Sequence, residues 1–325
     1  MNSENHVKVA IIGAGPSGIG LALGLAKRGV KSVLLIDRNE EIGGIPSVYK
    51  KKQGGVRTFI NLIRGRVVFG EQYTQWLAGK LAKAEPAIWL KSKVIEVEPS
   101  EKRITLINPD QGKVHVTANA VVMACGAREN SSIELGWLSG TRTGRTFFSK
   151  TLLELMDHHN VLPIKQPVIV GSDLNAYAAA AKLRTMGASN ATILDTRSRP
   201  KSPLYSRIYF QRWKSYPKYH GKVKSARFIG NGAASAIEVN NSMTIPCDGI
   251  VLSGDLIPNS ELAMLAHMNV EVHSRKPVVN SDYQLSEPGW FATGNILGGF
   301  HSAEWCYLHG KRVAKFVATY LKNNK

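Results

Sequence analysis

Cysteine is scarce in this chain of 325 residues, and long apolar runs are absent. Its three cysteines, Cys125, Cys247 and Cys306, lie far apart and form neither a CxxC pair nor a metal-ligand pattern. This spacing predicts structural thiols in a reducing compartment and no bound metal. No apolar stretch can span a bilayer, and residues 1–6 are polar with no signal-peptide core. We therefore expect a globular cytoplasmic protein.

Acidic residues are also scarce, because 24 Asp and Glu stand against 42 Lys and Arg, for a net charge of +18. The imbalance is greatest in residues 196–237, which contain ten basic residues, no acidic one and several aromatics. Such a segment can be a solvated basic face, or a surface that docks an acidic partner or a second copy of the chain. Nucleic acid or a membrane surface is a weaker interpretation, and Arg197 and Arg199 could instead contact an NADP 2′-phosphate.

The clearest pattern in the sequence lies near the N-terminus. An apolar run at residues 7–12 leads into the turn GAGPSG at residues 13–18, and a helical segment of small residues follows. A second apolar run, residues 33–36, ends in Asp37. Strand, glycine turn, helix, strand and acid form the dinucleotide-binding fingerprint in its required context.

Each element of this fingerprint has a physical role. Gly13 allows the tight turn, Gly15 lets backbone approach a pyrophosphate, and Gly18 allows close packing of helix and strand. The N-terminus of the helix directs its amide groups and positive dipole end at the phosphates. Asp37 is placed to accept hydrogen bonds from a ribose.

The same pattern recurs in the middle of the chain. The distance from Gly13 to Asp37 and from Gly171 to Asp195 is 24 residues in both cases, which predicts a second dinucleotide-binding fold. In this copy Asp173 replaces the middle glycine. Its side chain fills needed space and places a negative charge near two phosphates, so we expect weak or absent NAD(P)H binding.

The remaining segments are consistent with two such folds. A helix is predicted over residues 70–84, and an amphipathic helix over residues 302–321. Three short runs separated by turn residues predict a small antiparallel meander: residues 90–97, 103–107 and 113–118. Three further apolar runs predict strands that return to the first domain or complete it: residues 120–124, 249–254 and 290–295.

Together these motifs resemble flavoproteins with two dinucleotide-binding domains, the class that includes thioredoxin reductase and glutathione reductase. The resemblance implies an α/β fold of two Rossmann-like domains, the second inserted into the first. The first domain, residues 1–127 and 246–325, would bind FAD. The second, residues 128–245, would bind NAD(P)H in the family and is degenerate here.

The resemblance also implies which residues contact FAD: Gly13, Gly15, Pro16, Ser17, Gly18, Asp37, Arg38, Gly44, Ala124, Gly126, Gly294, Asn295 and Ser302. Residues 125–129 and 294–297 are similar to the α-type flavin subunits of sarcosine oxidase, opine oxidases and hydrogen cyanide synthase. Those subunits often carry a cysteine cluster or an iron–sulfur extension, which this chain lacks. Asn295 stands where the family usually has Asp.

The function implied is that of an FAD-dependent oxidoreductase. The leading hypothesis is a flavin subunit that oxidises a small amine, amino acid or related metabolite, with a partner chain. The alternatives are an NAD(P)H-dependent flavin reductase that passes electrons to a carrier or quinone, and a non-catalytic FAD-binding structural subunit. Because disulfide reductases of the class need a cysteine pair beside the flavin, we expect that the protein is not a disulfide reductase.

Candidate substrate-binding residues come from two regions. His301 at the start of the last helix could act as a base or orient a substrate carboxylate, or it could be a surface or capping histidine. Glu304 and Trp305 follow it in the sequence. Residues 46–70 are rich in Gly, Arg and Lys, show no regular period and are expected to form a long loop region. They supply the other candidates, Tyr49, Arg57 and Arg66, of which the two arginines could clamp a carboxylate.

Overall fold

The computed structural model of the chain describes residues 5–49, 57, 59–61, 65–130, 140–141, 143–254 and 256–324. The chain divides into two compact units, each with its own parallel sheet. Unit 1 comprises Met1–Ser47, Phe59–Arg128 and Ile257–Lys325, and unit 2 comprises Val48–Thr58 and Glu129–Leu256. Within the described ranges, no helix is long and apolar enough to cross a membrane.

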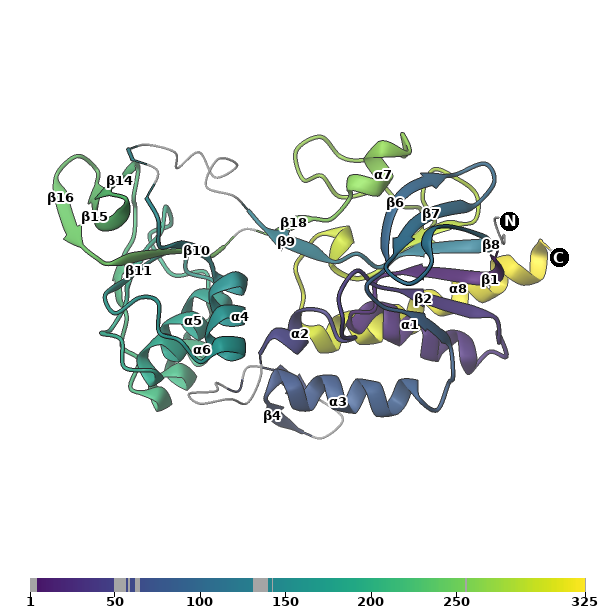
Figure 1. Ribbon diagram of the computed structural model, residues 1–325, viewed down its shortest axis with the longest axis horizontal. Coiled ribbons are helices and arrows are strands. Elements are labelled where there is room, and N and C mark those ends of the chain that lie inside the picture. The colour runs from purple at the N-terminus through teal and green to yellow at the C-terminus, as the bar shows by residue number, and fades with distance from the viewer. Residues whose placement is uncertain are drawn as a thin grey trace. The chain divides into compact units, whose positions relative to one another are not determined.

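Unit 1 is built around a sheet of order β5-β2-β1-β8-β7-β6, in which β19 also pairs with β8 (Figure 1). Its parallel strands are β1 (Asn5–Ile12), β2 (Val33–Ile36), β5 (Ala87–Trp89), β8 (Gly112–Met123) and β19 (Trp290–Ala292). Strands β6 (Lys93–Glu98) and β7 (Arg103–Asn108) continue it as the antiparallel meander. All four residues of β2 are buried and apolar, as parallel strands covered on both faces require.

Strand β8 differs from the prediction, which placed two separate strands at residues 113–118 and 120–124. Both segments belong to one strand of 12 residues. The first part of β8 pairs with β7, the last part pairs with β19, and β1 pairs along the other side. The meander and the nucleotide-binding sheet therefore share one continuous strand.

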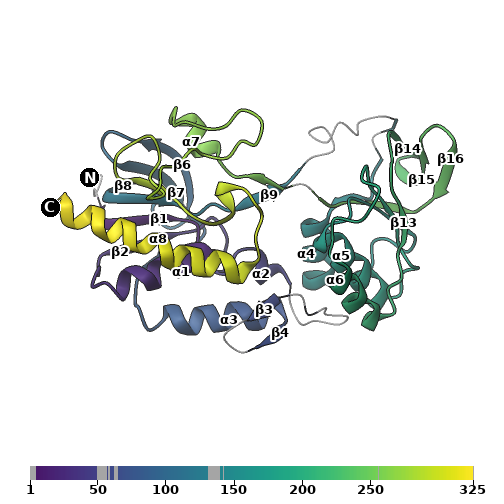
Figure 2. The same ribbon diagram turned by 180° about the vertical axis from the view of Figure 1, so that it is seen from behind.

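Three helices pack on one face of this sheet (Figures 1 and 2): α1 (Pro16–Ala26), α3 (Gly70–Leu81) and α8 (Ala303–Asn323). Helices α1 and α8 lie side by side because glycines let their backbones approach. A Cβ on Gly20 would lie 2.1 Å from the Tyr307 carbonyl oxygen, and one on Gly310 would lie 2.0 Å from the Ser17 carbonyl oxygen. This contact fixes the start of α8 next to the glycine turn.

Shorter elements occur between the main ones. They are the helices α2 (Ile45–Val48) and α7 (Glu261–Leu265), the 3-10 turn η3 (Gly294–Leu297), and the hairpin of β3 (Phe59–Asn61) and β4 (Arg66–Val68). Where the chain passes from one unit to the other, β9 (Ala127–Glu129) and β18 (Leu256–Pro258) form a two-stranded sheet.

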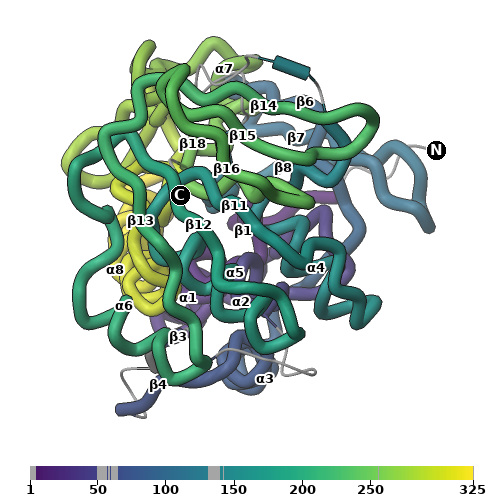
Figure 3. The backbone as a smooth tube through the Cα atoms, turned by 90° about the vertical axis from the view of Figure 1, so that its left-hand side faces the viewer, coloured from purple at the N-terminus to yellow at the C-terminus, as the bar shows by residue number. Residues whose placement is uncertain are grey.

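Unit 2 contains a parallel sheet of order β10-β17-β11-β12-β13. Its strands are β10 (Thr146–Phe148), β17 (Gly249–Leu252), β11 (Pro167–Val170), β12 (Thr192–Leu194) and β13 (Lys218–His220), and Figure 3 shows β11, β12 and β13 together. Its helices are α4 (Ser149–His159), α5 (Leu174–Thr185), α6 (Leu204–Phe210) and the 3-10 helix η2 (Gln211–Trp213). An antiparallel sheet follows, made of β14 (Ala226–Asn231), β15 (Ala233–Val239) and β16 (Met243–Pro246).

The return to the first unit comes later than the sequence indicated. We expected residues 246–325 to belong to the FAD-binding domain, but β17 lies between β10 and β11 in the sheet of unit 2. A buried apolar strand fits either sheet equally well by its pattern, so the sequence did not reveal which sheet residues 249–252 join. The α/β class, the two Rossmann-like sheets and the meander are confirmed.

Candidate functional site

The turn between β1 and α1 requires glycine at two positions for reasons internal to the protein. Gly13 has a φ of +117°, and a Cβ there would lie 2.4 Å from the Ala124 carbonyl oxygen. A Cβ on Gly18 would lie 1.9 Å from the Gly13 carbonyl oxygen. Side chains at these positions would collide with backbone, so the tight turn depends on both glycines.

Gly15 is different, because the protein itself leaves room for a side chain there. Its backbone is extended, with φ −76° and ψ −176°, and the nearest atom to an added Cβ is the Gly44 Cα at 3.9 Å. Gly15 is the N-cap of α1, which begins with Pro16 and has no side-chain cap. Glycine at this position therefore leaves room for a ligand rather than for another part of the chain. The free amide groups at the uncapped N-terminus of α1 suit a phosphate.

Asp37 ends β2 beside this turn and is buried. Its carboxylate oxygens accept hydrogen bonds from the backbone amides of Ala14 at 2.7 Å and Asn39 at 2.9 Å. A carboxylate has about four lone-pair sites, so each oxygen can accept a further bond from a ribose hydroxyl. Asp37 is thus both oriented by the backbone and able to bind a ligand.

The segment after β19 reaches the same turn from the C-terminal part of the chain. Gly294 has a φ of +78°, and a Cβ on it would lie 2.5 Å from the Ser17 hydroxyl oxygen. The preceding amide, that of Thr293, donates to the Met123 carbonyl oxygen at 3.0 Å and so keeps the segment aligned with β8. Residues distant in sequence therefore meet at the N-terminus of α1.

The entry into α8 uses two of the residues expected to bind the cofactor. Asn295 accepts from the His301 amide at 2.8 Å and donates to the His301 carbonyl oxygen at 3.1 Å. Ser302 is the N-cap of α8, and its hydroxyl accepts from the Trp305 amide at 3.2 Å. Both side chains hold the loop that begins the helix.

Three further expected residues lie near these elements. Ala124 is buried just beyond the end of β8, and Arg38 is exposed just after Asp37. Gly126 has a φ of +67°, and its carbonyl oxygen accepts from the Asn259 amide at 3.0 Å. The uncapped helix, the open position at Gly15 and the oriented Asp37 together fit the diphosphate and ribose of FAD.

The equivalent helix of unit 2 begins with the same backbone but a different side chain. Asp173 is the N-cap of α5, with φ −77° and ψ −176°, within a degree of the Gly15 values. Its carboxylate accepts hydrogen bonds from the Ala176 amide at 3.0 Å and the Ser253 hydroxyl at 2.8 Å. The chain's own carboxylate thus occupies the anion-binding position at this helix.

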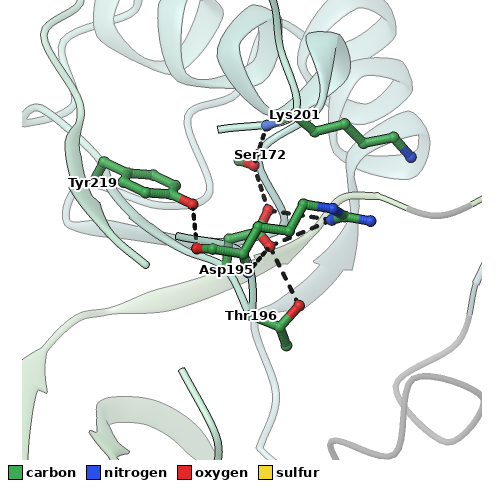
Figure 4. Close-up of polar contacts among 6 residues, drawn as sticks. Ser172, Asp195, Thr196, Lys201 and Tyr219 are labelled. Carbon is green, nitrogen blue, oxygen red and sulfur yellow. Dashed lines mark hydrogen bonds and ion pairs between the residues drawn. The ribbon is translucent and has the colours of Figure 1, made fainter. Parts of the chain in front are cut away.

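Asp195, which has the position of a ribose-binding acid in the sequence pattern of unit 2, forms its contacts with other residues of the chain (Figure 4). Asp195 is 2% exposed and accepts hydrogen bonds from the Ser172 hydroxyl and from the Arg197 amide at 2.8 Å. The Arg197 guanidinium lies 3.3 Å from the same carboxylate. Tyr219 donates to the Arg197 carbonyl oxygen at 2.7 Å and so holds this loop in place.

These contacts involve the two positions of unit 2 at which the fingerprint would hold the phosphates and the ribose of a nucleotide. Its phosphate position holds the Asp173 carboxylate, its ribose acid is buried and internally bonded, and the Arg197 guanidinium is paired. In unit 2 the chain's own groups therefore occupy the positions that the pattern assigns to a phosphate and a ribose. Arg199 is exposed, but no contact in the described part of the chain links it to this site.

The candidate substrate residues come from both units. Tyr49 and Arg57 fall in unit 2, where Tyr49 is buried and donates to Asn175 at 3.1 Å. Burial raises the pKa of Tyr49. Arg66 is exposed on β4 in unit 1.

Three candidates lie together at the start of α8. The rings of His301 and Trp305 stack with centroids 3.8 Å apart. The Glu304 side chain is buried instead, and its carboxylate accepts a hydrogen bond from the Tyr73 hydroxyl at 3.0 Å. Burial raises the pKa of Glu304. His301 and Trp305 are both exposed, so solvent or a substrate can reach them, and of the two only His301 can act as a base.

The structure also contains buried polar residues that sequence patterns did not single out. His309 on α8 bonds to the turn after β19, and Lys182 on α5 forms an ion pair with Asp157 on α4 at 2.6 Å. Histidine and lysine are common on exposed helix faces, so neither residue stands out in the sequence. The only signal of their burial was a polar residue on an otherwise apolar helix face.

The three cysteines are all held as thiols. Burial raises the pKa of Cys125 and of Cys306 to about 12, and it also raises the pKa of Cys247. Cys125 and Cys306 belong to unit 1, and Cys247 belongs to unit 2. In the described part of the chain no group of His, Cys, Asp and Glu could hold a metal ion.

Comparison with known proteins places this geometry in a family. The model of the pyridine nucleotide-disulphide oxidoreductase family matches residues 7–310. A soluble pyridine nucleotide transhydrogenase from Vibrio atlanticus is 22% identical over 98% of this chain and 72% of its own length.

Two solved structures show the same fold. Bacillithiol disulfide reductase from Bacillus cereus has a TM-score of 0.77 at 17% identity and covers 97% of this chain and 99% of its own. L-proline dehydrogenase from P. horikoshii has a TM-score of 0.70 at 20% identity and covers 98% of this chain, which spans 56% of the dehydrogenase chain.

These findings correct one expectation from the sequence. The missing cysteine pair was interpreted as excluding a disulfide reductase, but the matching family model and the similar proteins include disulfide-type reductases, so that exclusion is wrong. Cysteine spacing describes one active site within the family and does not define its fold or cofactors. The family uses FAD together with NAD(P)H. The chain belongs to the pyridine nucleotide-disulphide oxidoreductase family of flavoproteins.

Proposed function

We propose that the protein is an FAD-dependent oxidoreductase whose flavin receives electrons from a small amine, amino acid or related metabolite. The observation that carries this proposal is the contrast between Gly15 and Asp173, which have the same backbone conformation at the same helix position. Unit 1 leaves the position open for a phosphate, whereas unit 2 fills it with a carboxylate. An electron donor other than NAD(P)H follows from that difference.

The energies involved support this choice. Two like charges at about 4 Å repel by roughly 4 kcal/mol at an effective dielectric constant near 20. The helix dipole that favours an anion contributes only about 0.3–1 kcal/mol, and the Asp173 carboxylate already uses it. Binding NAD(P)H would also require replacing the bonds of Asp173 to Ala176 and Ser253.

The resemblance to α-type flavin subunits and the likeness to an L-proline dehydrogenase support the choice of substrate class. Within that class we propose His301 as the group that accepts a proton from the substrate amine or orients its carboxylate. His301 is exposed, and its ring is supported by stacking on Trp305. The runner-up function is an NAD(P)H-dependent reductase that passes electrons to a carrier.

The proposal predicts which compounds reduce the flavin. Under anaerobic conditions, the FAD-loaded protein should not be bleached by micromolar NADH or NADPH, because the nucleotide site of unit 2 is filled by the chain itself. At least one member of a panel of small amines and amino acids should bleach it. Stopped-flow absorbance at the flavin band measures this, and dithionite provides the control that the flavin can be reduced. Rapid stoichiometric bleaching by either nucleotide would reject the amine hypothesis and favour the reductase.

We further propose that residues 204–214, within the basic segment 196–237 of unit 2, dock an acidic partner chain of a complex. Helix α6 exposes Leu204, Tyr205 and Ile208, which are 62%, 73% and 54% exposed. Arg212 and Lys214 next to it are exposed, and Arg212 stacks over the Tyr209 ring at 5.2 Å. Apolar contact area surrounded by cations is the pattern expected of a surface that binds an acidic protein.

Charge reversal tests this surface. A variant with Arg212→Glu and Lys214→Glu should lose the co-purifying partner, and the wild-type complex should weaken steeply between low and high salt. Arg207 is left unchanged because it is half-buried. The matched control is Lys8→Glu and Lys31→Glu in unit 1, which should leave the complex intact. Sedimentation analysis that gives a salt-insensitive monomer would contradict the proposal.

A further inference from the structure

His309 is a buried histidine of α8 that its neighbours hold in one orientation. Its imidazole stacks on the Trp305 ring with centroids 4.6 Å apart and an interplanar angle of 14°. The Tyr283 ring meets it edge-on, with centroids 4.8 Å apart and an interplanar angle of 88°. The residue is 8% exposed. Aromatic contacts on two sides leave the ring little freedom to rotate.

The Nδ1 atom of this ring faces the turn that follows β19. It lies 3.3 Å from the Gly294 amide nitrogen and 2.9 Å from the Thr293 hydroxyl oxygen. A backbone amide can only donate, so Nδ1 must be the acceptor and the imidazole carries its proton on Nε2. Burial, together with Arg312 and His301, lowers the pKa of His309 to about 4, which keeps it neutral at ordinary pH.

The turn that His309 holds is in a conformation few residues adopt. Gly294 has a φ of +78°, and it packs so closely on Ser17 that an added Cβ would lie 2.5 Å from that hydroxyl. Ser17 lies in the first turn of α1, next to the open position at Gly15. Any reorientation of the Gly294 amide would therefore move backbone at the site where FAD binds.

We propose that His309 is a positioning residue for the FAD site: its Nδ1 atom fixes the Thr293–Gly294 turn against Ser17. It acts through Gly294 and needs no contact with the cofactor. Without the acceptor, the Gly294 amide loses its partner in a buried environment, and the turn can rotate to find another. The inference depends on FAD binding to unit 1 and is independent of which substrate reduces the flavin.

The test is His309→Phe, which keeps a ring for stacking on Trp305 and removes the acceptor. Titration of the apoprotein with FAD, followed by fluorescence, should show a dissociation constant raised roughly ten- to a hundredfold. The visible circular dichroism of the bound flavin should change, because its surroundings are altered. His309→Asn, whose amide oxygen is attached to Cγ as Nδ1 is and can serve as the acceptor, should recover affinity to within about threefold of the wild type.

The matched control is His115→Phe. His115 also contacts a threonine hydroxyl, that of Thr105 at 3.1 Å, but it lies on β8 in the meander. Its replacement should leave the FAD affinity and the flavin circular dichroism unchanged. If His309→Phe binds FAD within about twofold of the wild type with the same dichroism, the proposal is overturned. If that variant does not fold, His309→Leu removes the same acceptor with a smaller side chain, and unchanged affinity and dichroism in it would overturn the proposal equally.

Discussion

A Gly15→Asp variant is expected to fold and to lose FAD. The backbone of Gly15 already matches that of Asp173, and a Cβ at Gly15 meets no protein atom closer than 3.9 Å. The new carboxylate can cap α1 as Asp173 caps α5, so the apoprotein should be as stable as the wild type or slightly more so. The same carboxylate would repel the FAD diphosphate by roughly 4 kcal/mol, a loss of about a thousandfold in affinity.

Two comparisons make this experiment decisive. Gly13→Ala should instead destabilise the apoprotein, because its Cβ would lie 2.4 Å from the Ala124 carbonyl oxygen. Asp173→Gly in unit 2 should leave FAD affinity unchanged. Thermal unfolding of each apoprotein and FAD titration separate folding from binding. A Gly15→Asp protein that keeps its yellow colour through dialysis would show that FAD does not approach the chain at this turn.

Breaking the buried ion pair of unit 2 should have the second large effect. Lys182 and Asp157 join α5 to α4 at 2.6 Å, and both side chains are 3% exposed. Lys182→Met leaves the Asp157 carboxylate buried without its cation, which costs about 3–5 kcal/mol in free energy of unfolding. Replacing both partners, with Asp157→Leu added, should recover most of that loss because no buried charge remains.

Hydrogen exchange measured by mass spectrometry over residues 149–185 reports this change locally, which matters because the two units need not unfold together. The matched control is Lys150→Met. Lys150 forms an ion pair with Glu154 at 3.5 Å on the surface of α4, the helix that carries Asp157, and both side chains are about 40% exposed. Loss of this surface ion pair should cost less than about 0.5 kcal/mol in free energy of unfolding. Equal protection in Lys182→Met and Lys150→Met would refute the assignment.

Local patterns predicted the elements of the first nucleotide-binding unit well. The strand at residues 33–36 has the bounds expected, and the helix expected after the glycine turn is α1, which begins within that turn at Pro16. The signals that predict these elements are local, because the apolar runs and the glycine turn all lie within 31 residues of sequence, from residue 7 to residue 37. The strand β10 and the helix α4 carried no such turn signal and were missed.

The sites were harder to predict because their decisive contacts join distant residues. Asp195 has the position of a ribose-binding acid in the sequence, yet its bond to Ser172 shows that the protein itself uses it. Lys182 looks like any solvated helical lysine until its partner 25 residues away is known. His309 contacts Gly294 only because glycines let α8 approach α1. Sequence periodicity does not record such pairings.

The division of the first sheet between the two ends of the chain has a consequence for biosynthesis. Strand β8 ends at Met123, but its partner β19 begins only at Trp290, and α8 follows β19 in the sequence. At translation rates of about 5–20 residues per second, the edge of β8 stays unpaired for roughly ten seconds or more while unit 2 is synthesised and completes its own sheet. A ribosome-bound chain can therefore fold unit 2 first, and it can load flavin only when α8 has emerged.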